Sequence, residues 1–126
     1  MSAIDLAEEV FLAVAPAALA PHFADPDRWP RQWPGLAPVA EADRGIEGMR
    51  WRLTGDLRGS MEVWLQPVLD GTVLHYFLRA DPPGPRRGRW VTAELRRRRL
   101  AVRELVFELK SRLEAGRAPG CPPPSR

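Results

Sequence analysis

Few side chains in this 126-residue sequence have the chemistry of a catalyst. The histidines are His22 and His75, the single tyrosine is Tyr76 and the single cysteine is Cys121. His75 has the residue type of a general base, and Tyr76 could act as an acid or donate a hydrogen bond to a carbonyl group. Cys121 lies among prolines and glycines, where nothing indicates an activated thiol. We therefore assign no catalytic residue from the sequence, and whether the protein is an enzyme stays open.

Metal binding is not indicated by the pattern of possible ligands. The two histidines lie far apart in the chain, and the single cysteine cannot complete a zinc site with them. The carboxylates show no spacing that would build a site, and one cysteine cannot form an internal disulfide. We expect no metal ion and no cofactor.

Basic side chains are concentrated in the C-terminal third of the chain. Residues 84–126 hold 12 basic and 4 acidic side chains, whereas residues 1–83 hold 7 basic and 12 acidic ones. Such an asymmetry can indicate a polyanionic partner. However, the consecutive residues Arg96–Arg99 would point in different directions on a helix, and abundant arginine, alanine and proline are typical of GC-rich coding. We therefore expect no nucleic-acid partner.

Arg98 and Arg99 interrupt the apolar stripe of a helix that residues 92–115 are expected to form. A charge in such a stripe is costly unless it is paired, solvated or bound to a ligand. Glu94 precedes Arg98 by four residues, which suits a helical ion pair. The arginines could also extend along the helix to water, or one of them could contact an anionic head group of a ligand. The sequence leaves these alternatives open.

The segment between residues 37 and 80 is predicted to form a meander of antiparallel strands. Asp70-Gly71 lies between alternating apolar runs and favours a two-residue turn, which would place Leu65 opposite Tyr76. This register keeps the apolar residues of both strands on one face.

The preceding hairpin is predicted to have a three-residue loop at 54–56, which aligns Trp51 with Gly59. This loop also keeps the faces of the two strands matched. A two-residue loop would instead turn Arg50 and Arg52 toward the apolar face, where they would be strained or directed at a ligand.

The N-terminal region predicts a strand followed by short helices. Residues 3–14 alternate apolar and polar side chains, the pattern of a half-buried strand, with Glu8 as the one misfit. Pro16 can open a short helix, which Pro21 is expected to end or kink. Residues 25–35 then predict a second short helical segment, stopped by proline and glycine.

Tryptophans mark that second segment, and a long helix is predicted at the C-terminal end. Trp29 and Trp33, four residues apart, share one helical face. Residues 92–115 contain no proline or glycine and many strong helix formers, until Gly116 ends the pattern. These residues predict one long helix with an apolar stripe.

This order of elements resembles the START-like (helix-grip) superfamily, and within it the bacterial polyketide cyclase/dehydrase and lipid-transport group. The resemblance implies an α+β helix-grip (START/Bet v 1-like) fold, with a curved antiparallel sheet, two short helices and one long C-terminal helix. We expect this domain at residues 1–117 and a disordered proline-rich tail at 118–126. The likeness is carried by the N-terminal strand into APAALAPHFADPDRWPRQWPGL, then DRGIEGMRWRLTG, GSMEVWLQPVLDGTVLHYFLR and the terminal helix.

The resemblance also implies a cavity between the concave face of the sheet and the C-terminal helix. We therefore expect the protein to bind an apolar or aromatic small molecule there, as a carrier or a sequestering protein. A polyketide aromatase/cyclase or dehydrase is the alternative. Each candidate could instead simply fill a core. The candidate ligand-binding residues are Trp29, Trp33, Met49, Trp51, Met61, Val63, Leu65, Tyr76, Leu78, Arg98, Arg99, Val102 and Leu109.

The remaining expectations concern location and assembly. No apolar run is long enough to span a membrane, and the N-terminus lacks the pattern of a signal peptide. These observations predict a cytoplasmic protein. Leu100 and Phe107 form a second small ridge on the long helix, and with Trp64 and Phe77 on the convex sheet face they could support a homodimer.

Overall fold

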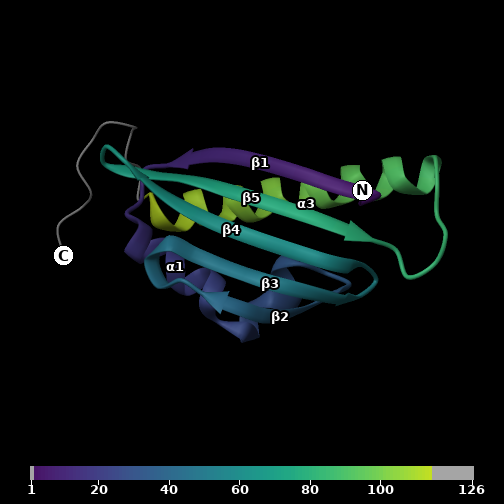
Figure 1. The fold of residues 1–126 in the computed structure, drawn as a ribbon. Coiled ribbons are helices and arrows are strands. Elements are labelled where there is room, and N and C mark those ends of the chain that lie inside the picture. The colour runs from purple at the N-terminus through teal and green to yellow at the C-terminus, as the bar shows by residue number, and fades with distance from the viewer. Residues whose placement is uncertain (1, 115–126) are drawn as a thin grey trace.

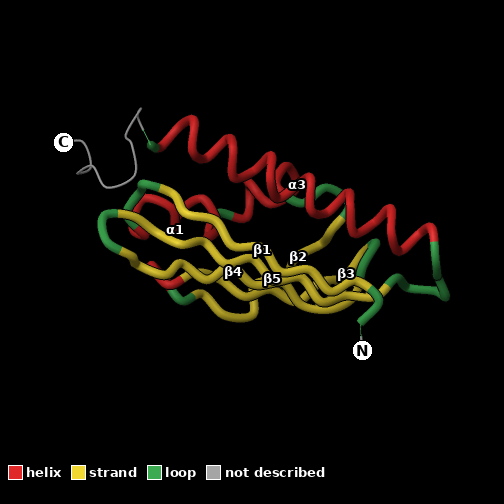
Figure 2. Tube along the Cα trace, turned by 90° about the horizontal axis from the view of Figure 1, so that it is seen from above, coloured by secondary structure: helices red, strands yellow, loops and turns green. Residues whose placement is uncertain are grey.

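The computed structural model describes residues 2–114, so the boundary predicted at residue 117 and the predicted tail at 118–126 lie outside it. Five antiparallel strands form one sheet in the order β1-β5-β4-β3-β2, and α3 runs along one side of it (Figure 1, Figure 2). The fold class is α+β, as predicted. The elements are β1 (Ile4–Leu12), α1 (Pro16–Ala24), η1 (Pro26–Arg28), α2 (Trp29–Gln32), β2 (Leu36–Asp43), η2 (Gly45–Glu47), β3 (Gly48–Gly55), β4 (Arg58–Val68), β5 (Gly71–Asp81) and α3 (Arg89–Leu113).

One face of the sheet is buried because apolar and polar residues alternate along the strands. Glu8, the misfit of the N-terminal strand, lies among the apolar residues of β1, and its Oε1 is 3.2 Å from Arg99 Nε on α3. The carboxylate therefore serves as a partner for the helix. The buried face comprises Ile4, Leu6, Leu12, Met49, Trp51, Leu53, Met61, Val63, Leu65, Leu74, Tyr76 and Leu78.

The hairpin between β4 and β5 has a different register from the predicted one. Leu65 pairs with Leu74, two residues before its predicted partner, and residues 69–70 form the loop. The prediction placed Gly71 in the turn, but this glycine belongs to β5, where a Cβ atom would lie 2.6 Å from the Phe11 ring. Because the shift is two residues, every side chain keeps its predicted face.

The hairpin between β3 and β4 is shifted by two residues as well. Trp51 pairs with Met61 rather than with Gly59. Leu57 lies in the connection and is fully buried, and the longer connection allows this side chain to reach the core. Arg50 remains on the solvent-exposed face, so the alternative that turned the arginines inward is wrong.

Helix α1 continues past the proline that was expected to end it. Pro21 lies inside α1, which runs from Pro16 to Ala24. The proline costs the helix one backbone hydrogen bond. Leu19 and Phe23, one turn apart, are fully buried in the core, and their burial offsets that cost. The short helices are therefore kept in place by the residues that they bury.

Three tryptophans attach the short helices to the sheet. The Trp33 ring centroid lies 4.8 Å from that of Trp51 on β3, and the Trp29 centroid lies 5.7 Å from it. Both pairs meet edge to face, the geometry that aromatic rings favour. Trp51 has no exposed surface and is the common partner of the other two.

We predict that Trp51→Ala lowers the free energy of unfolding by about 3–5 kcal/mol, because it leaves a cavity under both other rings. Chemical denaturation measures the change. Trp64→Ala is the matched control, since Trp64 is 39% exposed on the outer face of the sheet, where its ring stacks on that of His75. That control should cost about 1 kcal/mol, and an equal loss in both variants would contradict the role of Trp51.

Candidate functional site

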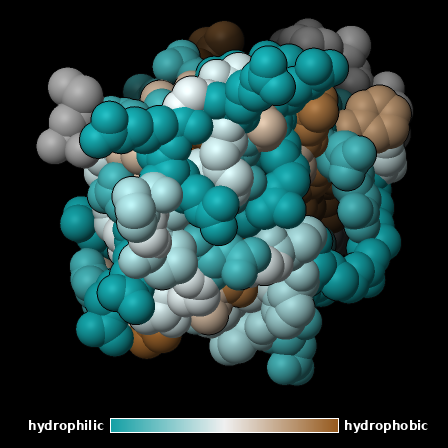
Figure 3. All heavy atoms as spheres, turned by 90° about the vertical axis from the view of Figure 1, so that its right-hand side faces the viewer, coloured by the Kyte–Doolittle hydropathy of each residue, from teal (hydrophilic) through white to brown (hydrophobic). Residues whose placement is uncertain are grey.

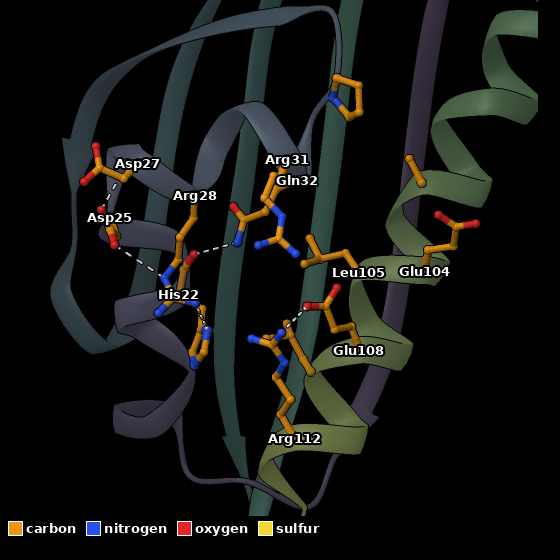
Figure 4. A pocket seen from close by; sticks show the side chains of 13 residues that line it. His22, Asp25, Asp27, Arg28, Arg31, Gln32, Glu104, Leu105, Glu108 and Arg112 are labelled. Atoms are coloured by element: carbon orange, nitrogen blue, oxygen red, sulfur yellow. Dashed lines mark hydrogen bonds and ion pairs between the residues drawn. The ribbon is translucent and has the colours of Figure 1, made fainter.

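A groove of about 570 Å³ lies between the short helices and α3. We call it the helical groove. One wall is built by α1, η1 and α2, and the other by the C-terminal half of α3; Figure 4 shows the two walls facing each other. It is lined by His22, Asp25, Asp27, Arg28, Arg31, Gln32, Pro34, Ala101, Glu104, Leu105, Glu108, Leu109 and Arg112.

The apolar part of the helical groove comes mainly from α3. Ala101, Leu105 and Leu109 are spaced by four residues and share one side of the helix. Pro34 adds an apolar ring from the turn after α2. In Figure 4, Leu105 lies opposite the second short helix. The groove therefore offers an apolar strip between charged edges.

Ion pairs fix most of the charged side chains of the two walls. Arg28 Nε lies 3.4 Å from Asp25 Oδ2 on one wall, and Arg112 Nη2 lies 3.0 Å from Glu108 Oε1 on the other. Asp25 also accepts a hydrogen bond from a backbone amide at the start of η1, which holds that turn. The walls are thus ordered before any ligand arrives, apart from the side chains that lack such partners.

Arg31 on α2 has no ion-pair partner among residues 2–114, and Glu104 on α3 has none there either. Both line the helical groove, and Figure 4 shows Arg31 between the walls. Asp27 on η1 also lines the groove without an ion pair among these residues, so one guanidinium and two carboxylates are available to a polar group placed there.

His22 contributes a neutral imidazole to the groove. Arg28 Nη1 lies 2.9 Å from His22 Nδ1, and because a guanidinium can only donate, Nδ1 must accept and Nε2 must carry the proton. Burial lowers the pKa of His22 below its ordinary value of 6.5, and the charges of Arg28 and Arg112 lower it further, although Glu108 raises it. At neutral pH the ring therefore presents an N–H donor.

This depressed pKa predicts that acid weakens the fold through His22. The neutral ring is favoured in the folded chain, so its contribution is complete above pH 6.5 and is lost as the pH falls through the lower folded pKa. The His22→Gln variant cannot take up that proton. Between about pH 7.5 and about pH 5, its free energy of unfolding should fall less than that of the natural protein. Denaturant titrations at both pH values measure the free energy of unfolding. An equal fall in the two proteins would refute the role of His22.

The structure places the sequence-predicted residues mainly in the core rather than on a groove. Of these thirteen, only Leu109 lines the helical groove. Val102 lines a second groove of about 380 Å³ between β1 and α3, which we call the β1 groove. The following are buried: Trp29, Trp33, Met49, Trp51, Met61, Val63, Leu65, Tyr76, Leu78, Arg98, Val102 and Leu109.

The two arginines of the α3 stripe have different environments. Arg98 is 3% exposed, and its Nη2 lies 3.1 Å from Oε2 of Glu94, which is also buried. Its Nη1 donates a 2.7 Å hydrogen bond to the carbonyl oxygen of Pro34. The ion pair predicted from the spacing is therefore present, and the alternative that Arg98 reaches water is wrong. Arg99 is partly exposed and pairs with Glu8.

Removing one partner of the buried pair should be costly. We predict that Arg98→Leu lowers the free energy of unfolding by about 3–5 kcal/mol, because buried Glu94 then keeps only the exposed Arg97 as an ion-pair partner. Replacing both residues with leucine should recover most of the loss. Arg97→Leu is the control, since Arg97 also pairs with Glu94 but is 59% exposed, and it should cost under about 1 kcal/mol. A double variant no more stable than Arg98→Leu would contradict the ion-pair account.

Sequence reasoning missed the charged wall of the helical groove. In DPDRWPRQW, the tryptophans face the core, so the charged residues between them must face outward. On α3, Ala101, Leu105, Glu108 and Arg112 follow helical spacing beside the buried stripe. The sequence therefore indicates each of these two surfaces by itself, but it does not indicate that they face each other.

Residues 2–114 show neither a cluster of metal ligands nor a membrane-spanning helix. No group of three potential metal ligands comes together there, and no helix is long and apolar enough to cross a membrane. The consecutive arginines do not form one basic track, because Arg97 and Arg98 pair with Glu94 while Arg99 pairs with Glu8. The end of the molecule near the β5–α3 connection is hydrophilic over most of its surface (Figure 3).

No protein-family model matches the chain, and no curated protein does. Three solved structures resemble it. The Aha1 dimer from Colwellia psychrerythraea has a TM-score of 0.63 and 9% identity, over 91% of this chain and 99% of that one. DR_A0006 from Deinococcus radiodurans has a TM-score of 0.64 and 15% identity, over 86% and 98%. Ara h 8.0201 has a TM-score of 0.49 and 14% identity, over 82% of this chain and 97% of that one.

The first two matches, with the strand order and the long C-terminal helix, identify the fold as helix-grip, as the sequence predicted. At these identities the likeness concerns the fold alone. The narrower assignment to the polyketide cyclase/dehydrase and lipid-transport group stays a prediction.

Proposed function

We propose that the protein binds a small molecule with an apolar or aromatic body in the helical groove, as a carrier or a sequestering protein. The observation that carries the proposal is the groove itself. Its volume of about 570 Å³ falls in the range of small-molecule sites, about 300–1,000 Å³. Its four apolar lining residues form a strip that would contact an apolar body, and the nine polar residues around that strip would orient the ligand.

The groups along the groove suit a ligand with at least one polar end. Leu105 and Leu109 would contact the apolar body, while Arg31, Glu104 and the His22 N–H could meet polar atoms. Because the ion pairs hold the neighbouring charged residues, a ligand would not have to order most of the walls.

The thirteen residues predicted from the sequence remain candidates for ligand contact. Most fill the space between the sheet and α3, so a ligand that reached them would have to move side chains. Met49 and Met61 are flexible enough to allow such repacking. Leu109 belongs both to this set and to the helical groove, and it joins the two regions.

The enzyme alternative receives less support. His75 is hydrogen-bonded to Gln66 at 2.9 Å and stacks on Trp64 on the outer face of the sheet, away from the groove. Burial raises the pKa of Tyr76, which keeps the hydroxyl protonated and makes it a hydrogen-bond donor rather than a base. A binding protein therefore fits these groups better than a polyketide cyclase or dehydrase.

Location and assembly stay predictions. The cytoplasmic assignment rests on the sequence alone. Phe107 is 73% exposed and Leu100 is 49% exposed on the outer side of α3, which would suit the homodimer considered from the sequence. One structure of similar fold, that of Aha1, is a dimer. Sedimentation at several concentrations would decide the matter for this chain.

The proposal predicts that a larger side chain in the helical groove weakens the binding of an apolar ligand. The fluorescent probe anilinonaphthalene sulfonate should bind the natural protein, and Leu105→Trp should weaken that binding by about tenfold or more. Leu100→Trp is the matched control, because the same substitution on the exposed side of α3 leaves the groove open. Fluorescence titration measures both. Absence of probe binding, or an equal loss in the control, would count against the groove as the site.

A further inference from the structure

Two indole N–H groups in the core have no hydrogen-bond partner among residues 2–114. They belong to Trp33, which is 2% exposed, and to Trp51, which has no exposed surface. Trp29, in the same cluster, donates its N–H to the carbonyl oxygen of Phe23 at 2.8 Å. Folded proteins pair the large majority of buried polar groups, because a buried group without a hydrogen-bond partner destabilises the fold. The two unpaired indoles are therefore exceptions within one cluster.

Two more donors in the core are only weakly satisfied. The Tyr76 hydroxyl donates to Met61 Sδ at 3.2 Å, and a thioether is a weak acceptor. Arg98 Nη2 lies near the Glu94 carboxylate but makes no hydrogen bond to a described residue. Four buried donor groups therefore lack a strong hydrogen-bond acceptor, although Arg98 has the Glu94 carboxylate and the Pro34 carbonyl oxygen beside it.

These four groups form one connected cluster, which we call the donor cluster. The rings of Trp33 and Trp51 are in contact, and Trp51 pairs across the sheet with Met61, the partner of Tyr76. Arg98 is close enough to Tyr76 for its charge to act on the hydroxyl, opposing the effect of burial on the pKa. The donor cluster comprises Trp33, Trp51, Tyr76 and Arg98.

Only one turn of chain separates the donor cluster from the helical groove. Pro34 lines the groove, and its carbonyl oxygen accepts the hydrogen bond of Arg98 Nη1. Gly35 follows with a φ of +80°, and a Cβ atom at this position would lie 3.6 Å from Arg98 Nη2. The turn therefore runs directly over the guanidinium. A polar group that entered beside Pro34 would approach Arg98, the member of the donor cluster that contacts this turn.

We propose that the ligand is an apolar acid whose carboxylate is received by the donor cluster. A carboxylate offers about four lone-pair positions and no donor, which matches a set of donors with one cationic member. An ammonium group would find the Glu94 carboxylate already paired with Arg98 and would otherwise face N–H and O–H donors, so it should bind less tightly than the acid. This inference rests on the proposed function and specifies its ligand.

The test uses three probes that share one apolar body: phenylpropionate, phenylpropanol and phenylpropylamine. Calorimetric titration of the full chain should show the acid binding at least about tenfold more tightly than the amine, with the alcohol between them. Tyr76→Phe and Trp51→Phe each remove one donor and keep an aromatic ring, so each should reduce the ratio of acid to amine affinity. Trp64→Phe is the matched control and should leave the ratio unchanged.

A second measurement needs no substitution in the core. The chain has five indole N–H groups, and a proton–nitrogen correlation spectrum resolves such groups individually. Phenylpropionate should shift the Trp33 and Trp51 signals downfield and leave the Trp64 signal in place. This readout decides the matter if the core variants fail to fold.

The outcomes separate the two proposals. Binding of all three probes with equal affinity, or unchanged indole signals, would overturn the carboxylate inference and leave small-molecule binding intact, with neighbouring ring faces as the partners of the indoles. No binding of any probe, together with no binding of anilinonaphthalene sulfonate, would overturn both.

Discussion

A guanidinium that is 97% removed from solvent can persist only where the fold supplies partners for it, and the arrangement of this protein depends on that requirement. Arg98 takes its partners from two places: Glu94 one turn earlier on α3, and the carbonyl oxygen of Pro34 after α2. The second contact fixes the distance between the short helices and α3. It therefore sets the width of the helical groove and holds Trp33 against Trp51.

The two regions on either side of the Pro34 turn have complementary chemistry. The groove side is a strip of aliphatic carbon between charged edges, where most charges are paired and Asp27, Arg31 and Glu104 have no ion pair among the described residues. The core side is aromatic and rich in donors. A molecule with an apolar body and one acid group would match both at once. Neither region alone distinguishes such a ligand from other apolar compounds.

The faces of the strands and the long helix could be predicted from the sequence, because residues two or four apart reveal which side is buried. The registers could not, since the role of Gly71 depends on Phe11, which lies on β1. The connection between β3 and β4 is likewise longer than predicted, because Leu57 within it is buried in the core. The helical groove could not be predicted either, because it forms only where residues 22–34 pack near residues 101–112, which are distant in the sequence. Local patterns carry no information on such meetings.

The position of β1 in the sheet has a consequence for synthesis of the chain. Leu6 pairs with Leu78, so β1 has no neighbouring strand in the described domain until β5 has been made. Pairings this distant in sequence are slow to form, and the apolar face they create stays open until α3 covers it. Nearly the whole domain must therefore leave the ribosome before strand β1 can pair.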